Sequence, residues 1–192
     1  NILNLNLLSE FLQNNIFIIE KKIGEFVKNI YLIINNHQVV NVYIGIKKKN
    51  YEKILSKNFL DKTLVEVKDL FHENYQNYKI MHMIINKYYI NNKYISSFEE
   101  NLTGDHLSIE VQFISVPKST VEKINKVLEK YHIKISEYLD GDYVGNFFKS
   151  EKLELSEMGS RILAGINENE VKLIPKTYKK KGFFEKFFQL FS

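Results

Sequence analysis

The chain has 192 residues, of which 44% are hydrophobic, and its formal net charge is +4 at pH 7. This length suits one domain of ordinary size with appendages, and the hydrophobic content is enough for a folded core. The sequence contains no cysteine, which excludes disulfides and thiolate metal sites and is consistent with a cytosolic protein.

The basic residues number 27, and Arg161 is the only arginine among them. Arginine is favoured for bidentate contacts to phosphates and bases, so this composition disfavours nucleic-acid binding. No apolar run approaches the 18 residues of a membrane-spanning helix. Because the sequence begins with Asn1 and not Met, we interpret it as a fragment or a processed chain.

The first third of the chain predicts one helix and two strands. Apolar residues at three- and four-residue steps predict an amphipathic helix over residues 5–28. The β-branched run 30–34 predicts a buried strand, and residues 35–37 a turn. Residues 40–46 alternate between apolar and other side chains and predict a second strand, followed by a polar loop at 47–50.

The middle third predicts a helix and a pair of strand segments. Asp61 is a candidate N-cap for a helix with Leu64, Val67, Leu70 and Phe71 on its apolar side. Residues 79–85 and 87–90 predict strands, which residues 91–92 interrupt. A loop is then expected up to Gly104.

A further strand, helix and strand follow. Residues 107–116 alternate and predict a half-exposed strand that Pro117 ends. Ser119 and Glu122 have the spacing of a capping box, which predicts the start of a helix. Residues 133–139 predict a short closing strand.

The predicted order α-β-β-α-β-β-α-β indicates an α+β fold, with helices packed on a small, mostly antiparallel sheet over residues 5–139. Residues 140–181 have a weaker pattern and are expected to be a weakly structured connector or flexible tether, partly helical within 147–166, with Ser156 as a possible cap. Residues 182–192 are expected to form an amphipathic membrane-targeting helix.

That last segment combines an aromatic face with basic residues. On a helix its large apolar side chains share one face, and Glu185, Gln189 and Ser192 lie opposite. This pattern is typical of a helix that lies in an anionic membrane interface. The candidate membrane-binding residues are Phe183, Phe184, Phe187, Phe188, Leu190, Phe191, Lys179, Lys180, Lys181 and Lys186. The alternative is a soluble domain whose Phe-rich tail docks on its own core.

Four short motifs, taken together in their order along the chain, resemble the inserted subdomain of the bacterial actin-like cell-division protein FtsA. They are the turn Asn35-Asn36-His37-Gln38, the strand Met81-His82-Met83-Ile84-Ile85, the step Tyr88-Tyr89-Ile90-Asn91, and the loop Asn101-Leu102-Thr103-Gly104 with the strand Leu107-Ser108-Ile109-Glu110-Val111. The helix from Ser119 to Tyr131 matches the last helix of that subdomain, and the closing segment from Lys179 to Ser192 is similar to the membrane-targeting helix of the family. The resemblance covers residues 5–139 and 176–192.

The resemblance implies a non-enzymatic, membrane-associated adaptor of the septal FtsZ ring, at the cytoplasmic face of the bacterial inner membrane at the division site. Its expected partners are an anionic membrane surface, division-ring proteins and a second copy by self-association, with no nucleic acid. Ile85 replaces the proline of the family, and residues 35–36 replace its Ser-Gly turn. The eight glycines include no Gly-Gly pair, so we expect a truncated member without nucleotide, cofactor or metal. Alternatives are a fragment of a complete actin-like ATPase or of a pilus-assembly actin homologue.

Other candidate sites favour structural roles. No two of the five histidines (His37, His72, His82, His106 and His132) have a metal-ligand spacing, and His82 is expected to be a half-buried packing residue. Asp105 and His106 beside Ser108 suggest nucleophilic catalysis, but no elbow motif accompanies them. The triplet 47–49 is expected in a solvated loop, and Tyr75, Tyr78, Tyr88, Tyr89 and Tyr94 in ordinary packing positions.

Overall fold

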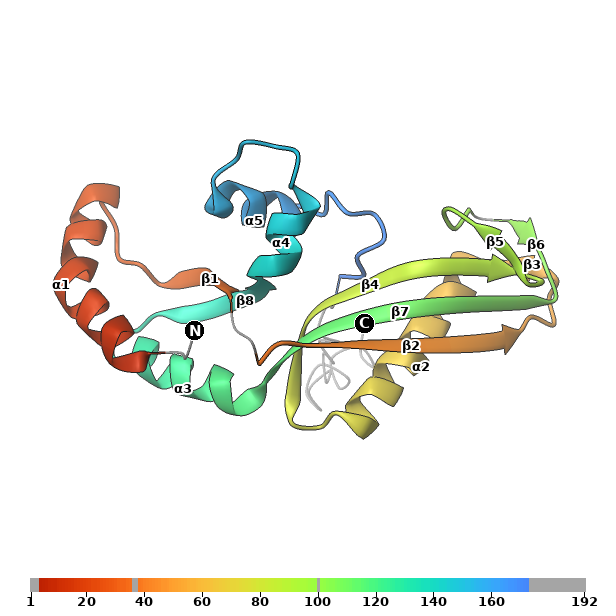
Figure 1. The fold of residues 1–192 in the computed structure, drawn as a ribbon, viewed down its shortest axis with the longest axis horizontal. Coiled ribbons are helices and arrows are strands. Elements are labelled where there is room, and N and C mark those ends of the chain that lie inside the picture. Colours follow the sequence, from red (N-terminus) through yellow and green to blue (C-terminus); the bar gives the residue numbers. More distant parts are fainter. Residues whose placement is uncertain (1–3, 36–37, 100, 173–192) are drawn as a thin grey trace, which may run out of the picture.

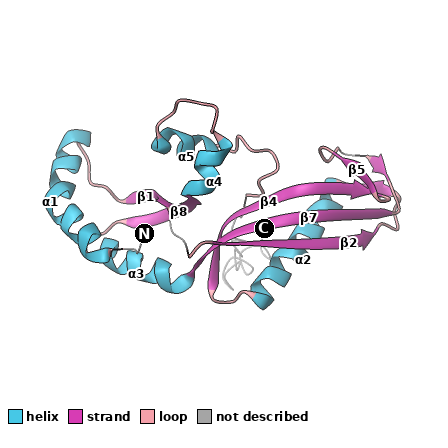
Figure 2. Cartoon of the chain, viewed as in Figure 1, coloured by secondary structure: helices cyan, strands magenta, loops and turns pink. Residues whose placement is uncertain are grey.

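The computed structural model describes residues 4–35, 38–99 and 101–172, and it shows an α+β protein (Figures 1 and 2). One part of the molecule is a long antiparallel sheet with a helix along one face, and the other is a group of helices around two short strands. The two parts share the same central strands. The α+β class predicted from the sequence is confirmed.

The long sheet has four strands in the order β2-β7-β4-β5, all antiparallel. They are β2 (Val40–Lys49), β7 (His106–Pro117), β4 (Tyr78–Ile90) and β5 (Lys93–Ile95). Exposed and half-buried side chains alternate along β2, as expected for a strand with one covered face. Residues 80–85 of β4 are all buried because both faces of the sheet are covered there.

Helix α2 (Lys57–Asn74) packs on one face of this sheet and builds an apolar core. The rings of Phe71 on α2 and Phe113 on β7 stack 4.7 Å apart, and both side chains are fully buried. A second, two-stranded sheet closes the far end of this part, formed by β3 (Ile54–Leu55) and β6 (Leu102–Thr103).

The opposite face contributes to a second core. Helix α1 (Leu5–Ile23), strand β1 (Asn29–Ile34), helix α3 (Lys118–Glu129) and strand β8 (Lys134–Asp140) surround it, and β1 pairs with β8 in parallel. Met81 and Ile84 of β4 belong to this second core, whereas Met83 and Ile85 belong to the first. The strand therefore joins the two parts through its alternate faces.

The chain then folds back onto β4. Helices α4 (Gly141–Phe147) and α5 (Leu155–Leu163) pack on β8, and Gly159 lets α5 approach closely, because a Cβ there would lie 2.9 Å from Ile33 Cδ1. Beyond α5, the Ile85 N–H donates to the Asn169 carbonyl at 2.9 Å, and the Val171 N–H donates to the Met83 carbonyl at 2.8 Å. Residues 169–171 therefore lie antiparallel beside β4, with Glu170 opposite Ile84. We call them the return segment.

Several predicted boundaries are wrong for local reasons. Helix α1 ends at Ile23 and not at 28, because Gly24 adopts a left-handed φ of 78° and its N–H donates to the Glu20 carbonyl. Helix α2 begins before Asp61, since Ser56 is the N-cap and accepts from the Phe59 N–H.

Three further predictions are corrected. Residues 47–49 are the end of β2 and not a loop, because they pair with residues 106–108 of β7. The capping box is not formed: α3 begins directly after Pro117 without a side-chain cap. The described part of the connector, residues 140–172, is not weakly structured, because α4, α5 and the segment beside β4 bury apolar side chains there. Residues 36–37 of the predicted turn and residues 173–192 of the tail lie outside the described residues.

Candidate functional site

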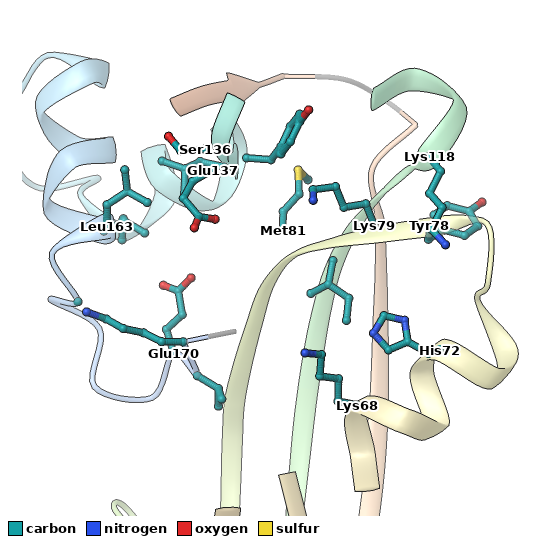
Figure 3. A pocket seen from close by; sticks show the side chains of 17 residues that line it. Lys68, His72, Tyr78, Lys79, Met81, Lys118, Ser136, Glu137, Leu163 and Glu170 are labelled. Carbon is teal, nitrogen blue, oxygen red and sulfur yellow. The ribbon is translucent and has the colours of Figure 1, made fainter. Parts of the chain in front are cut away.

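A pocket of about 550 Å³ lies where the two parts of the molecule meet. Its walls come from the end of α2, the first residues of β4, the middle of β8 and the chain after α5 (Figure 3). Ile80, Met81 and Leu163 supply apolar surface, and the remainder of the lining includes several charged side chains. The site therefore combines an apolar floor with polar walls, as ligand sites commonly do.

One wall of the pocket is basic. Lys68 and His72 are four residues apart on α2, Lys118 is the first residue of α3, and Lys79 lies on β4 (Figure 3). Within the described ranges, none of these three lysines forms an ion pair. The ammonium of Lys79 lies 5.0 Å from the centre of the Tyr138 ring, a cation–π contact.

The positive charge of this wall acts on His72. Burial lowers the pKa of His72, and the nearby charges of Lys68 and Lys118 lower it further. Asp69 acts in the opposite direction but does not reverse the effect. The lowered pKa holds the imidazole toward its neutral form, first through burial and then through the positive charge around it.

The other wall contains Glu137 and Glu170, and Glu170 belongs to a hydrogen-bonded network centred on His82. His82 Nδ1 lies 2.6 Å from Glu170 Oε1, and the side chain of His82 is fully buried. The Asp140 N–H donates to His82 Nε2 at 2.9 Å. His82 on β4 therefore joins the end of β8 to the segment that returns beside β4.

These contacts define the tautomer of His82. Nε2 accepts the Asp140 N–H, so it carries no proton, and Nδ1 is the protonated nitrogen that donates to Glu170. A second proton on Nε2 would face the Asp140 N–H and break that bond. The geometry thus has His82 donate from Nδ1 to a carboxylate and accept at Nε2, an arrangement that orients both partners.

Tyr143 completes the network. Its hydroxyl donates to Glu170 Oε2 at 2.8 Å and accepts from Asn167 Nδ2 at 2.9 Å. Burial raises the pKa of Tyr143, so it remains protonated and able to donate. Asp140 Oδ1 accepts the Tyr143 N–H at 2.7 Å and caps α4, while burial raises the pKa of Asp140. Among the described residues, the one buried side-chain polar atom without a hydrogen-bond partner is Ser115 Oγ, which lies outside this cluster. The network therefore holds the return segment in place.

The residues that suggest catalysis are not brought together by the fold. Ser108 lies within β7, opposite Tyr89, and Asp105 precedes the strand. His106 pairs with Lys49 at the end of β2. Among residues 4–35, 38–99 and 101–172, no group of three or more His, Asp and Glu side chains is arranged to hold a metal ion.

The other candidate residues have ordinary contacts. Lys48 pairs with Glu66, and Lys49 lies 5.0 Å from the ring centre of Tyr51. Tyr75 stacks on Phe71, and Tyr88 is buried with its hydroxyl 3.4 Å from Asn169. The ten candidate membrane-binding residues, in the range 179–191, lie outside the described residues, and so does His37. In the described part, no helix is long and apolar enough to cross a membrane.

The sequence prediction placed His82 as half-buried packing, and this is corrected to a fully buried, doubly hydrogen-bonded side chain. Its partners could not be found from local patterns, because Glu170 is 88 residues away and lies in the predicted tether. One local signal was available in the sequence. Asp140 is a typical N-cap residue, and its position three residues before Tyr143 could have predicted the start of α4 and so placed both residues together.

Taken together, the fold and the site define an α+β protein with a basic pocket beside a sheet edge. No protein-family model matches the chain. No curated protein matches it either.

Proposed function

We propose that this chain is a non-enzymatic, membrane-associated adaptor of the bacterial division ring, resembling FtsA. Its α+β unit would make the protein contacts, with FtsZ-ring components and other division proteins as partners. The segment 182–192 would hold it at the cytoplasmic face of the inner membrane at the division site. This function requires no nucleotide or cofactor.

The observation that carries the proposal is the placement of three of the FtsA-like motifs, residues 81–85, 88–91 and 107–111, on the strands and hairpin turn of one sheet. Residues 81–85 and 88–90 lie on β4, residues 107–111 lie beside them on β7, and α3 follows directly. Asn91, the last residue of the Tyr88 motif, starts the tight turn into β5 with a φ of 49°. Motifs that are individually short thus occupy neighbouring positions in one structural unit, in the order that the resemblance implies.

The membrane part of the proposal rests on the amphipathic pattern of the tail. Lysines near an anionic surface contribute about 1 kcal/mol each, and burial of Phe side chains adds about 1.5–3 kcal/mol apiece before ordering costs. A tail of this kind gives reversible binding. It leaves the folded unit free to contact other proteins at the membrane surface.

Co-sedimentation with vesicles that contain anionic lipid tests the anchor. We expect the full chain to pellet with the vesicles, and both deletion of residues 182–192 and Phe187→Glu to weaken binding at least tenfold. Phe17→Glu is the matched control, because Phe17 is an exposed phenylalanine of α1, 73% accessible, and lies outside the segment 182–192. Unchanged binding after the deletion would refute the anchor.

A fluorescent fusion of the full chain in dividing bacteria tests the ring assignment. We expect it to gather at midcell and to lose that position with Phe187→Glu. A uniform membrane signal would contradict the ring role while leaving the anchor intact. Protection of the tail amides from hydrogen exchange without lipid would instead favour the alternative, a soluble domain with a docked tail.

A further inference from the structure

Among the described residues, one stretch of the β4 edge beside the pocket has no strand partner. On the side away from β7, residues 88–90 of β4 pair with β5, and residues 83–85 accept the return segment 169–171. Residues 78–80 and 82 pair with β7, with a register shift at Met81. Within the described ranges, residues 78–82 have no strand on the other side, and we call this stretch the open edge. An unpaired strand edge offers backbone N–H and C=O groups to another extended chain.

The pocket lies against this same stretch. Tyr78, Lys79, Ile80 and Met81 all line it, so the open edge is also its floor (Figure 3). Five residues of strand extend about 14–17 Å, enough for four or five residues of an added strand. The return segment already pairs antiparallel with residues 83–85, directly next to this stretch. This side of β4 can therefore bind an antiparallel strand.

The charge of the pocket determines which kind of extended chain can bind there. Lys68 and Lys118 make no ion pair with any described residue and lie beside the open edge, with His72 between them (Figure 3), and Lys172 also lines the pocket. The acidic Glu170 is already engaged by His82 and Tyr143. Glu137 also lines the pocket, but the lining contains four lysines (Lys68, Lys79, Lys118 and Lys172) against these two glutamates, so its net charge is positive and favours an acidic chain.

We infer that the pocket binds an extended acidic segment of a partner protein, which pairs with residues 78–82 of β4 as an added strand. The identity of this occupant as a partner segment rests on the proposed function, in which the α+β unit acts by protein contacts. The other available strand is the chain's own continuation. Residues 173–192 contain five lysines and one glutamate, a charge that the basic wall repels.

Fluorescence anisotropy without lipid tests this inference on the full chain. The probe is a labelled peptide of about eight residues that alternates Glu and Val, and the control peptide alternates Lys and Val. We expect saturable binding of the acidic peptide and none of the basic one. The Lys68→Glu/Lys118→Glu variant should lower the affinity more than tenfold. Lys62→Glu, an exposed residue of α2 away from the pocket, should change it less than twofold.

Strand pairing has its own test. Two further peptides are N-methylated on odd or on even residues, which removes the donors of one edge at a time. We expect one of the two to lose binding and the other to keep it, because only one edge of the added strand faces β4. Equal binding of both would overturn strand pairing, and equal competition by free glutamate or inorganic phosphate would reduce the site to one for small anions.

A last variant separates the partner from the chain's own tail. Leu173→Pro in the full chain removes a backbone N–H that a tail paired with β4 would need, and we expect it to leave peptide affinity within twofold. A rise of more than tenfold would show that the tail occupies the edge and would overturn the inference. Because no membrane is present in these measurements, loss of vesicle binding alone would refute the anchor and leave the pocket standing.

Discussion

Adjacent residues of β4 show two different ways of holding this molecule together. Met83 faces the core under α2, where its neighbours are apolar, and it is 1% exposed. His82 is equally buried but faces the opposite side, where Glu170, Asp140 and Tyr143 surround it with polar groups. Apolar packing depends on shape and volume, whereas the network depends on donors and acceptors matching one another.

The difference indicates separate tasks. The core under α2 gains stability from burial wherever the chain is well packed. The network around His82 specifies one arrangement, because it joins β4, the start of α4 and the return segment through atoms that each need a partner. The segment that it holds ends at the border of the basic pocket.

The largest effect is expected in the apolar core. Phe113→Ala removes a fully buried ring that stacks on Phe71, and it should lower the free energy of unfolding by about 3–5 kcal/mol. Urea unfolding measures this. Phe17→Ala, at an exposed site, should cost less than about 0.5 kcal/mol. Similar costs for the two would contradict the placement of the core.

The second-largest loss of stability is expected from a mutation in the polar network around His82. His82→Ala removes the partner of Glu170 Oε1 and of the Asp140 N–H, while Tyr143 still donates to Glu170 Oε2, and this should cost about 2–4 kcal/mol. Met83→Leu, one residue away and similar in volume, should cost less than about 1.5 kcal/mol. If the two variants proved equally mild in urea unfolding, His82 would be a packing residue only.

A smaller and more local effect is expected at Tyr143. Tyr143→Phe keeps the ring but removes the bonds to Glu170 and Asn167, which should cost about 1 kcal/mol. The loss should be concentrated in the return segment, so amide exchange of Val171 should speed up while that of Phe71 on α2 follows global unfolding only. Uniform acceleration of both amides would show that the network does not act locally.

The same contrast explains what the sequence could predict. Alternation and helical periodicity located α1, β2, α2, β4, β7, α3 and β8, because each shows its buried face in neighbouring residues. The interruption of the strand at Asn91 and Asn92 was also visible, but the hairpin into β5 was not predicted; asparagine tolerates the φ values of 49° and 67° found in that turn.

The remaining features depend on contacts between distant residues. Strands β3, β5 and β6 have two or three residues each, too few for a periodic pattern. Glu170 gains its role only when the chain returns beside β4, and the basic wall draws Lys68, Lys79 and Lys118 from three separate elements. No local sequence pattern predicts contacts between residues so far apart in the chain. The site could therefore be identified only from the structure.

The smallest expected effect concerns pH and Asp140. Burial raises the pKa of this carboxyl in the folded protein above its unfolded value, although its bond from the Tyr143 N–H opposes the change. The folded state therefore holds the proton more tightly, and stability should fall as pH rises from the ordinary carboxyl range, near 3.8, toward the folded pKa. Above both pKa values the full penalty for the buried charge remains.

Asp140→Asn removes this charge while its amide oxygen can still cap α4. We expect the variant to match the parent protein at low pH and to be slightly more stable near pH 7, so that the difference between them grows through this window. Thermal unfolding of both proteins between pH 3 and pH 7 measures it. A constant difference across the range would show that Asp140 does not titrate with folding, and the network would then owe its stability to hydrogen-bond geometry alone.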